Sequence, residues 1–184
     1  MKKLILIMGD LASGKTTFAK KISKQYKIAS LNKDALKELA SNNLPYQSKQ
    51  ESKALSILAV EVMIDMFKEF CEFDLPLILE ANFHQDEIDI IHKIADEHNY
   101  DVLTLLIQAD IEILHKRFVN RAENENRHPV HLSYTLKEFE EFKKYIETSR
   151  NDKPLGKVIK VNANSFDYQK DKELLDQIDK FINA

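Results

Sequence analysis

Short, mainly apolar runs alternate along the chain with segments of helical periodicity. Runs of this kind are typical of strands that are buried on both faces of a parallel sheet. They predict five strands, at residues 4–8, 27–31, 77–79, 102–107 and 157–161. Because helical segments separate the strands, the connections should be right-handed crossovers that cover both faces of the sheet. The pattern therefore predicts an α/β fold.

Apolar positions repeated every three or four residues predict the helices. They lie at residues 18–26, 34–41 and 85–98, from near Ile111 onward, and from Leu174 to Ile182. A long helix is expected after Ser48, because Ser48 and Glu51 match a capping box. Its apolar stripe is expected in the core and contains Leu55, Leu58, Val62, Met66 and Phe70, widened by Ile57, Met63 and Phe67. No repeat or linker divides the chain, so residues 1–184 are expected to form one domain.

Residues 9–16 read Gly-Asp-Leu-Ala-Ser-Gly-Lys-Thr and match the phosphate-binding loop pattern G-x-x-x-x-G-K-[ST]. A predicted strand precedes this loop and a predicted helix follows it, as the pattern requires. The chain has three glycines, and two of them occupy the two glycine positions of the pattern. In such a loop, backbone N–H groups converge on a bound anion, and the start of the next helix adds to the attraction. The loop predicts binding of a nucleoside triphosphate.

The loop and the residue after it supply the expected nucleotide contacts: Gly9, Asp10, Leu11, Ala12, Ser13, Gly14, Lys15, Thr16 and Thr17. Lys15 is expected to reach the β- and γ-phosphates and to act in catalysis. The Thr16 hydroxyl is expected to bind Mg²⁺. ATP and Mg²⁺ are therefore the expected cofactors.

The composition of the chain indicates what type of protein carries this loop. The chain is 43% hydrophobic and 31% charged, as in ordinary globular proteins. The net charge of -3 supports no broad electrostatic footprint for nucleic acid. The apolar segment 4–8 is too short for a signal peptide, and no segment reaches membrane-spanning length. We expect a cytoplasmic protein that does not contact the membrane.

The rest of the sequence distinguishes among the classes of protein that use a phosphate loop. A switch GTPase would carry Asn-Lys-x-Asp, but Asn32-Lys33-Asp34 has its aspartate one place early, and no Asp-x-x-Gly follows the third strand. Motor and transporter ATPases usually end a strand in Asp-Glu, whereas strand 77–79 ends in the single acid Glu80. A small kinase fits the chain better.

Four segments together resemble P-loop kinases related to zeta toxins, chloramphenicol phosphotransferase and the kinase domain of polynucleotide kinase. These are the phosphate loop and residues 32–38, 79–83 and 121–129, and the resemblance extends from Met1 to about Phe166. It implies a three-layer P-loop NTPase sandwich with five parallel strands in the order 2-3-1-4-5. It also implies a helical acceptor region at about 34–73, an arginine lid at about 117–135, and transfer of the ATP γ-phosphate to a hydroxyl.

Three residues after the second and third strands are candidates for acceptor chemistry, because ligands bind at the carboxyl edge of such sheets. Asp34 is the candidate base for the acceptor hydroxyl, and the alternative is a helix cap. Glu80 is expected to reach Mg²⁺ through water or to hold the acceptor, and the alternative is a solvated strand end. Asn82 is expected to hydrogen-bond the acceptor. Lys37 is a further substrate-binding candidate, and it stands where polynucleotide kinases place an arginine.

Arg117, Arg121 and Arg127 are the candidate lid arginines. Guanidinium groups stabilise the charge that phosphoryl transfer spreads over the phosphate oxygens, so Arg121 and Arg127 are expected to act in catalysis. In the related kinases an arginine at the position of Arg117 often contacts the nucleotide. A solvated basic helix face is the alternative. His128 and His131, in the same segment, have no convincing metal-ligand spacing and are expected to have surface or packing roles.

The sequence thus predicts a kinase that phosphorylates a hydroxyl group of a small molecule. A polynucleotide 5′-hydroxyl kinase is the alternative among enzymes, and a nucleotide-dependent binding or switch ATPase is the alternative from another class. A pocket walled by residues 40–70 would favour a small molecule. A basic groove near Asp34 would favour nucleic acid, and a missing acceptor pocket would favour the switch.

Overall fold

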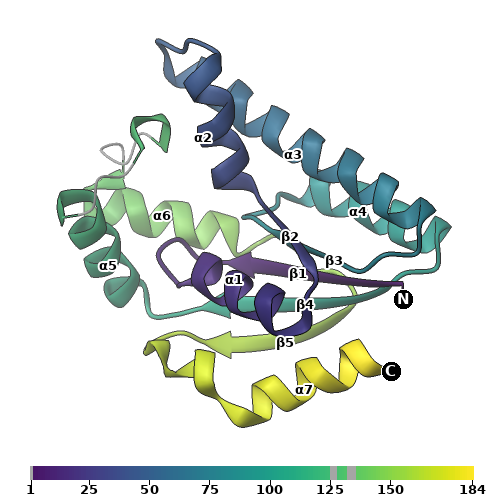
Figure 1. Cartoon of the computed structure of the whole chain (residues 1–184). Helices are drawn as coiled ribbons and strands as arrows, with labels where there is room; N and C mark the ends of the chain where they lie inside the picture. Colours follow the sequence, from purple (N-terminus) through teal and green to yellow (C-terminus); the bar gives the residue numbers. More distant parts are fainter. Residues whose placement is uncertain (1, 125–127, 132–135) are drawn as a thin grey trace.

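Five parallel strands form the centre of the fold (Figure 1). They are β1 (Lys3–Gly9), β2 (Ala29–Asn32), β3 (Leu77–Glu80), β4 (Asp101–Gln108) and β5 (Lys157–Asn162). The spatial order is β2-β3-β1-β4-β5, which confirms the α/β sandwich and the expected strand order. The computed structural model describes residues 2–124, 128–131 and 136–184.

Helices follow the strands in the expected alternation. They are α1 (Lys15–Tyr26), α2 (Lys33–Asn43), α3 (Lys49–Glu72), α4 (Gln85–Glu97), α5 (Ile111–Asn124), α6 (Phe139–Ser149) and α7 (Lys172–Asn183). Two short 3₁₀ helices are η1 (Pro129–His131) and η3 (Phe166–Lys170). The capping box of Ser48 and Glu51 is present at the start of α3. Helix α6 was not expected from the sequence.

The sheet is buried on both faces, and alternate residues of β1 belong to two different cores. Ile5 and Ile7 pack with apolar residues of α1, α5, α6 and α7. Leu4, Leu6 and Met8 pack with residues of α3 and α4 on the other face. A strand that is apolar at every position fits such a place, because each of its faces meets a layer of helices.

The apolar stripe expected on α3 is only partly in the core. Leu55, Met63 and Phe67 are buried, whereas the prediction was wrong for Leu58, Val62 and Met66, which are 38–39% exposed, and for Ile57, which is 48% exposed. The buried face instead includes Ala59, Val60, Ile64 and Cys71. Helix α3 carries apolar residues around most of its circumference, so periodicity alone did not select the face that meets the sheet.

Two methionines on α3 test this burial pattern. Met63→Ala should lower the free energy of unfolding by about 2–5 kcal/mol, because Met63 is fully buried against the sheet. Met66→Ala should change it by less than about 0.5 kcal/mol, since Met66 is partly exposed. Urea titration measures both variants, and the helix-propensity change is the same in each. Equal losses would contradict the observed packing of α3.

Candidate functional site

The phosphate loop leaves β1 through two glycines that no other residue can replace without strain. Gly9 has a φ of +125°, and a Cβ there would lie 2.1 Å from the Ile107 carbonyl oxygen. Gly14 has a φ of +91°, and a Cβ there would lie 2.9 Å from both the Phe166 ring and the Tyr168 hydroxyl oxygen. The sequence pattern therefore reflects two close approaches, to β4 and to η3.

The start of α1 is arranged to receive an anion. Its N-cap is Gly14, which has no side chain to accept from the first-turn N–H groups. Lys15 is buried, and its ammonium donates to the carbonyl oxygens of Gly9 at 3.0 Å and Asp10 at 2.6 Å. Burial lowers the pKa of Lys15, and the carboxylates of Glu80 and Asp34 oppose that shift. The ammonium thus lies against the loop, where a phosphate would meet it.

Asp10 anchors the loop to the rest of the fold through its side chain. Its carboxylate accepts from Arg150 Nη2 at 2.6 Å, from Arg150 Nε at 3.1 Å and from the Ala109 N–H at 3.1 Å. Hydrogen bonding to Asp10 raises the pKa of Arg150, although partial burial opposes the shift. Asp10 is 1% exposed, so only its backbone is left for the nucleotide contact expected from the sequence. Arg150, which follows α6, was not a sequence candidate.

Glu80 occupies a buried position between β1 and β2 at the carboxyl edge of the sheet. It pairs in register with Ile7 and with Asn32. Its carboxylate accepts hydrogen bonds from Thr16 Oγ1 at 3.1 Å and from the Asn32 amide. Burial raises the pKa of Glu80, and the Lys15 ammonium opposes that shift. Glu80 is 4% exposed, so the alternative of a solvated strand end is wrong.

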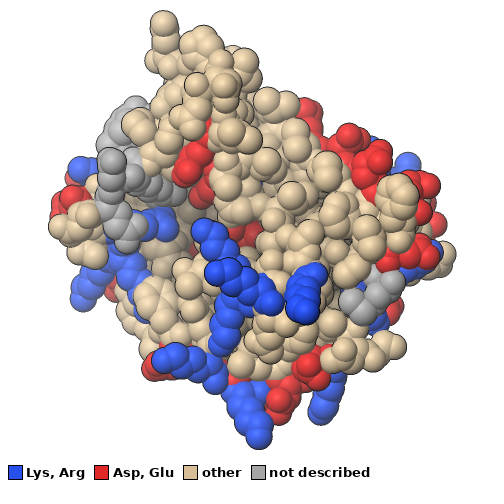
Figure 2. Space-filling model, viewed as in Figure 1, with Lys and Arg blue, Asp and Glu red and all other residues tan. Residues whose placement is uncertain are grey.

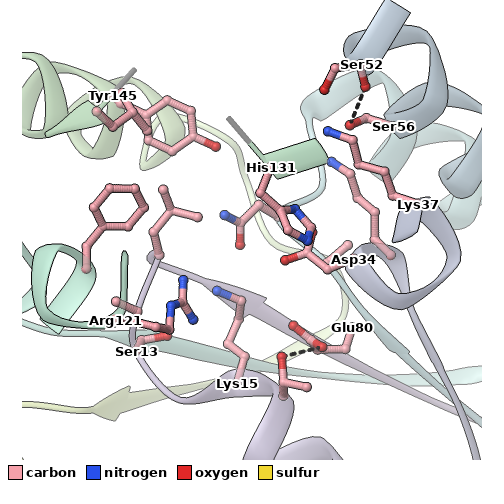
Figure 3. A pocket seen from close by; sticks show the side chains of 18 of the residues that line it. Ser13, Lys15, Asp34, Lys37, Ser52, Ser56, Glu80, Arg121, His131 and Tyr145 are labelled. Atoms are coloured by element: carbon pink, nitrogen blue, oxygen red, sulfur yellow. Dashed lines mark hydrogen bonds and ion pairs between the residues drawn. The ribbon is translucent and has the colours of Figure 1, made fainter. Parts of the chain in front are cut away.

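Asn32, and not Asp34, takes the helix-capping role that was the alternative for Asp34. Asn32 is the N-cap of α2, and its side-chain oxygen accepts from the Ala35 N–H at 2.6 Å. Asp34 lies in the first turn, and its side chain is 53% exposed. Figure 3 shows Asp34 beside Glu80, across the cavity from Arg121. Asp34 therefore borders the space in front of the phosphate loop.

One cavity of about 810 Å³ joins these groups (Figure 3). Residues 11–17 line the cavity, whereas Gly9 and Asp10, the first two residues of the phosphate loop, do not. Among the sequence candidates, it is also lined by Asp34, Lys37, Glu80, Asn82 and Arg121. Further lining residues that the sequence did not suggest include Lys33, Lys49, Gln50, Ser52, Lys53, Ser56, His131 and Tyr145. The cavity is thus shared by the phosphate loop, α2, the start of α3, α5, η1 and α6.

The short helix η1 closes one side of the cavity by docking on α2 and α3. The Ser52 hydroxyl donates to the Val130 carbonyl oxygen at 2.7 Å, and Val130 is fully buried. His131 Nε2 lies 2.6 Å from a Glu38 carboxylate oxygen, and its Nδ1 lies 3.9 Å from Asp34 Oδ1. The His131 side chain is only 6% exposed, so of the surface and packing roles expected for it, the surface role is wrong.

The candidate arginines have different surroundings. The Arg117 guanidinium donates to the carbonyl oxygens of Ala163 and Asn164 and stacks over the Phe166 ring, 4.1 Å from its centre. Arg117 does not line the cavity, whereas Arg121 does. Among the described residues, the buried Nε of Arg121 has no hydrogen-bond partner. Arg127 and residues 125–126 and 132–135 of the expected lid lie outside the described residues.

Asn82, which follows β3, and Tyr145 of α6 place further polar groups on the cavity wall. Burial raises the pKa of Tyr145, and a hydrogen bond with the Asn82 side chain opposes that shift. Within the described part of the chain, the buried Oδ1 of Asn82 has no hydrogen-bond partner. A ligand hydroxyl that entered the cavity would satisfy this oxygen.

A parallel sheet with a phosphate loop at the end of its central strand defines a P-loop NTPase. A family model described as an AAA domain matches residues 4–147 of the chain. The protein therefore belongs to the AAA-domain family of P-loop NTPases. A search of curated proteins finds no significant match.

Solved structures with the same fold include three from kinases. A candidate kinase from Chloroflexus aurantiacus J-10-fl has a TM-score of 0.80 at 22% identity, over 97% of this chain and 96% of that chain. A sugar kinase from Janibacter sp. HTCC2649 has a TM-score of 0.62 at 11% identity, over 100% and 95%. Shikimate kinase from Bacteroides thetaiotaomicron has a TM-score of 0.55 at 14% identity, over 99% of both chains. These similarities confirm the P-loop kinase fold.

None of the helices in residues 2–124, 128–131 and 136–184 is both long enough and apolar enough to cross a membrane. Among the same residues, no group of three or more His, Cys, Asp or Glu side chains is arranged to hold a metal ion.

The Asp10–Arg150 pair gives a stability test of the loop anchor. Arg150→Met should lower the free energy of unfolding by about 3 kcal/mol, because it leaves the buried Asp10 carboxylate without its cation. Adding Asp10→Asn should restore part of the loss. Lys153→Met, an exposed change three residues away, is the control in the same urea titration. If Arg150→Met is as stable as the control, the pair does not anchor the loop.

Proposed function

We propose that this protein is an ATP-dependent kinase that transfers the γ-phosphate of ATP to a hydroxyl group of a small molecule. The observation that carries the proposal is the cavity, in which the phosphate loop faces Asp34 and a separate wall made by α2 and α3. A nucleotide switch needs no second compartment beside its phosphate site. A cavity with room beyond the loop favours a reaction of two substrates.

The loop residues have the chemistry to hold the triphosphate. In the proposal, the Lys15 ammonium donates to the carbonyl oxygens of Gly9 and Asp10 before ATP binds and to phosphate oxygens afterwards. Thr16 and Glu80 would hold Mg²⁺, which neutralises charge on the transferred phosphate. Their side chains fit that ion because two oxygen atoms that can bind it, Thr16 Oγ1 at the start of α1 and Glu80 Oε2 at the end of β3, lie 3.1 Å apart.

Asp34 is the base in this proposal. The acceptor hydroxyl oxygen forms a bond to the γ-phosphorus while the bond from that phosphorus to the β–γ bridging oxygen breaks. ADP leaves, and the hydroxyl proton passes to the Asp34 carboxylate. Two observations support this assignment: Asp34 lines the cavity together with the phosphate loop, and Asn32 rather than Asp34 caps α2.

Arg121 and the proposed lid would act on the charge of the transition state. The buried Nε of Arg121 lacks a hydrogen-bond partner among the described residues, and its guanidinium lies near Lys15 in Figure 3. A phosphate oxygen is a suitable acceptor for such a group. Arg127 is assigned the same role and Arg117 a nucleotide contact, on the resemblance to related kinases alone.

One observation favours the second candidate, a polynucleotide 5′-hydroxyl kinase. Basic side chains gather on the face shown in Figure 2. In the sequence, Lys20 and Lys24 of α1 and its C-cap residue Lys27 are exposed. Basic stripes of this kind attract phosphate backbones. The wall formed by residues 49–56 and the docking of η1 instead enclose the acceptor side, which suits a small molecule.

An acceptor screen tests the proposal. ADP formation from ATP and Mg²⁺ should rise with one class among nucleosides, sugars, aminoglycosides and amphenicols, and mass spectrometry should find the phosphorylated product. Lys15→Ala should lower turnover by about 10²-fold or more and weaken thermal stabilisation by ATP–Mg²⁺, whereas Lys24→Ala, on the same helix, should not. Turnover only with 5′-hydroxyl oligonucleotides would favour the second candidate. ADP formation that no acceptor stimulates would favour the switch.

Asp34→Asn separates catalysis from stability. The amide keeps the size of the side chain but is a poor proton acceptor, so turnover should fall by about 10²–10⁴-fold. The melting temperature and the affinity for ATP should change little, because Asn32 caps α2. Asp65→Asn, an exposed change on α3, is the control. Unchanged turnover in Asp34→Asn with its true acceptor would remove Asp34 from the mechanism.

A further inference from the structure

The Asn32 side chain uses both ends of its amide group. Its oxygen, Oδ1, accepts from the Ala35 N–H at 2.6 Å and so caps α2. Its nitrogen, Nδ2, donates to Oε2 of Glu80, the residue that pairs with Asn32 in the register of β2 and β3. The same Glu80 oxygen accepts from Thr16 Oγ1 at 3.1 Å. One amide therefore joins the start of α2 to the carboxylate that Thr16 contacts.

The caps of two other helices show what capping alone requires. Ser48 accepts from the Glu51 N–H at the start of α3. Asp171 accepts from the N–H groups of Glu173 and Leu174 at the start of α7. In each case a single side-chain oxygen is enough, and serine, aspartate and asparagine cap helices about equally well. Any of the three residue types would therefore be sufficient to cap α2.

Glu80 explains why the cap of α2 is an amide. Glu80 is 4% exposed, so an aspartate in place of Asn32 would put a second carboxylate beside a buried one. A serine has one oxygen on a shorter side chain, and that oxygen would have to accept from Ala35 and also reach Glu80. Among the three good capping residues, only asparagine carries a donor and an acceptor on separate atoms. The amide of Asn32 thus serves Glu80 as well as α2.

We propose that Asn32 is a positioning residue that holds the Glu80 carboxylate for the Mg²⁺ of ATP and fixes the first turn of α2 beside it. This inference rests on the proposed function, in which Thr16 and Glu80 hold Mg²⁺ and Asp34 is the base. Residues that hydrogen-bond a metal-binding carboxylate orient it, and their loss typically costs about 10- to 100-fold in metal affinity or activity. Asp34 stands in the first turn of α2, two residues after Asn32. The amide would thus fix the metal ligand and the base relative to each other.

Nucleotide binding without turnover tests the link to Mg²⁺. The probe is a non-hydrolysable ATP analogue, titrated calorimetrically in Mg²⁺ and again in EDTA. Asn32→Ser keeps a good helix cap but loses the amide donor to Glu80. It should weaken binding of the analogue by about tenfold or more in Mg²⁺ and by less than about twofold in EDTA, because the phosphate loop itself is unchanged.

Two further variants separate positioning from stability. Asp171→Ala removes the cap of α7, a helix that does not line the cavity, so it should lower the melting temperature without changing the effect of Mg²⁺ on binding. Glu80→Gln removes the carboxylate that would bind Mg²⁺. If Asn32 acts through Glu80, adding Asn32→Ser to Glu80→Gln should weaken binding in Mg²⁺ by less than about twofold, because residues that act through one contact are not additive.

Turnover tests the link to Asp34. With the acceptor that the screen identifies, Asn32→Ser should lower kcat by about 10- to 100-fold at saturating ATP and Mg²⁺. The KM for the acceptor should stay within about threefold, because Asn32 does not line the cavity and only orients groups that do. Asp171→Ala should leave both values unchanged. Full kcat in Asn32→Ser would overturn the link to Asp34.

The outcomes separate this inference from the kinase proposal. If Asn32→Ser weakens binding equally in Mg²⁺ and EDTA, or in neither, or if its full effect persists beside Glu80→Gln, the positioning role is overturned, and the kinase proposal stands wherever an acceptor is phosphorylated. If the Mg²⁺ effect is lost through Glu80 but no acceptor is phosphorylated, the positioning role stands and the kinase proposal loses its support. If Mg²⁺ does not strengthen binding of the analogue to the wild-type protein, the roles of Asn32 and Glu80 are both overturned.

Discussion

The site depends on the contact between Gly9 and the Ile107 carbonyl. At the end of the central strand the chain must turn over β4 before α1 begins, and a Cβ at Gly9 would lie 2.1 Å from that oxygen. The next N–H, of Asp10, donates to the same oxygen at 2.9 Å, and the Asp10 carboxylate accepts from Ala109 and Arg150. The loop is therefore held by β4 and by the end of α6 as well as by its own turn.

Electrostatic compensation keeps this anchored loop ready for phosphate. Burial lowers the pKa of Lys15 and raises that of Glu80, and each group favours the charged form of the other. Thr16 and Asn32 add hydrogen bonds to the Glu80 carboxylate. In the proposed reaction a triphosphate with Mg²⁺ would take over both compensating roles, because it brings anionic charge to Lys15 and a cation to Glu80. The buried charges are thus arranged for exchange with a ligand.

The sequence predicted the parts of the fold and site that depend on local patterns. The strands, the phosphate loop and the places of Asp34 and Glu80 at the sheet edge follow from short segments. The buried face of α3 did not follow, because that helix is apolar around most of its circumference. Helix α6 was missed although Phe139, Phe142 and Ile146 have helical spacing. The Asp10–Arg150 pair spans 140 residues, and no local pattern indicates such a partner.

Local preferences of the sequence agree with the fold at both sides of the cavity, with one exception. At the phosphate loop, Gly9 and Gly14 stand at positive φ angles between a strand and a helix, but Ala12 also has a positive φ, of 59°. Along the other wall, Asn32 and Ser48 cap α2 and α3, and an acid, Asp34 or Glu51, stands in each first turn. Well-formed helix starts therefore fix the positions of the side chains on that wall, whereas the phosphate loop adopts a backbone conformation that alanine disfavours.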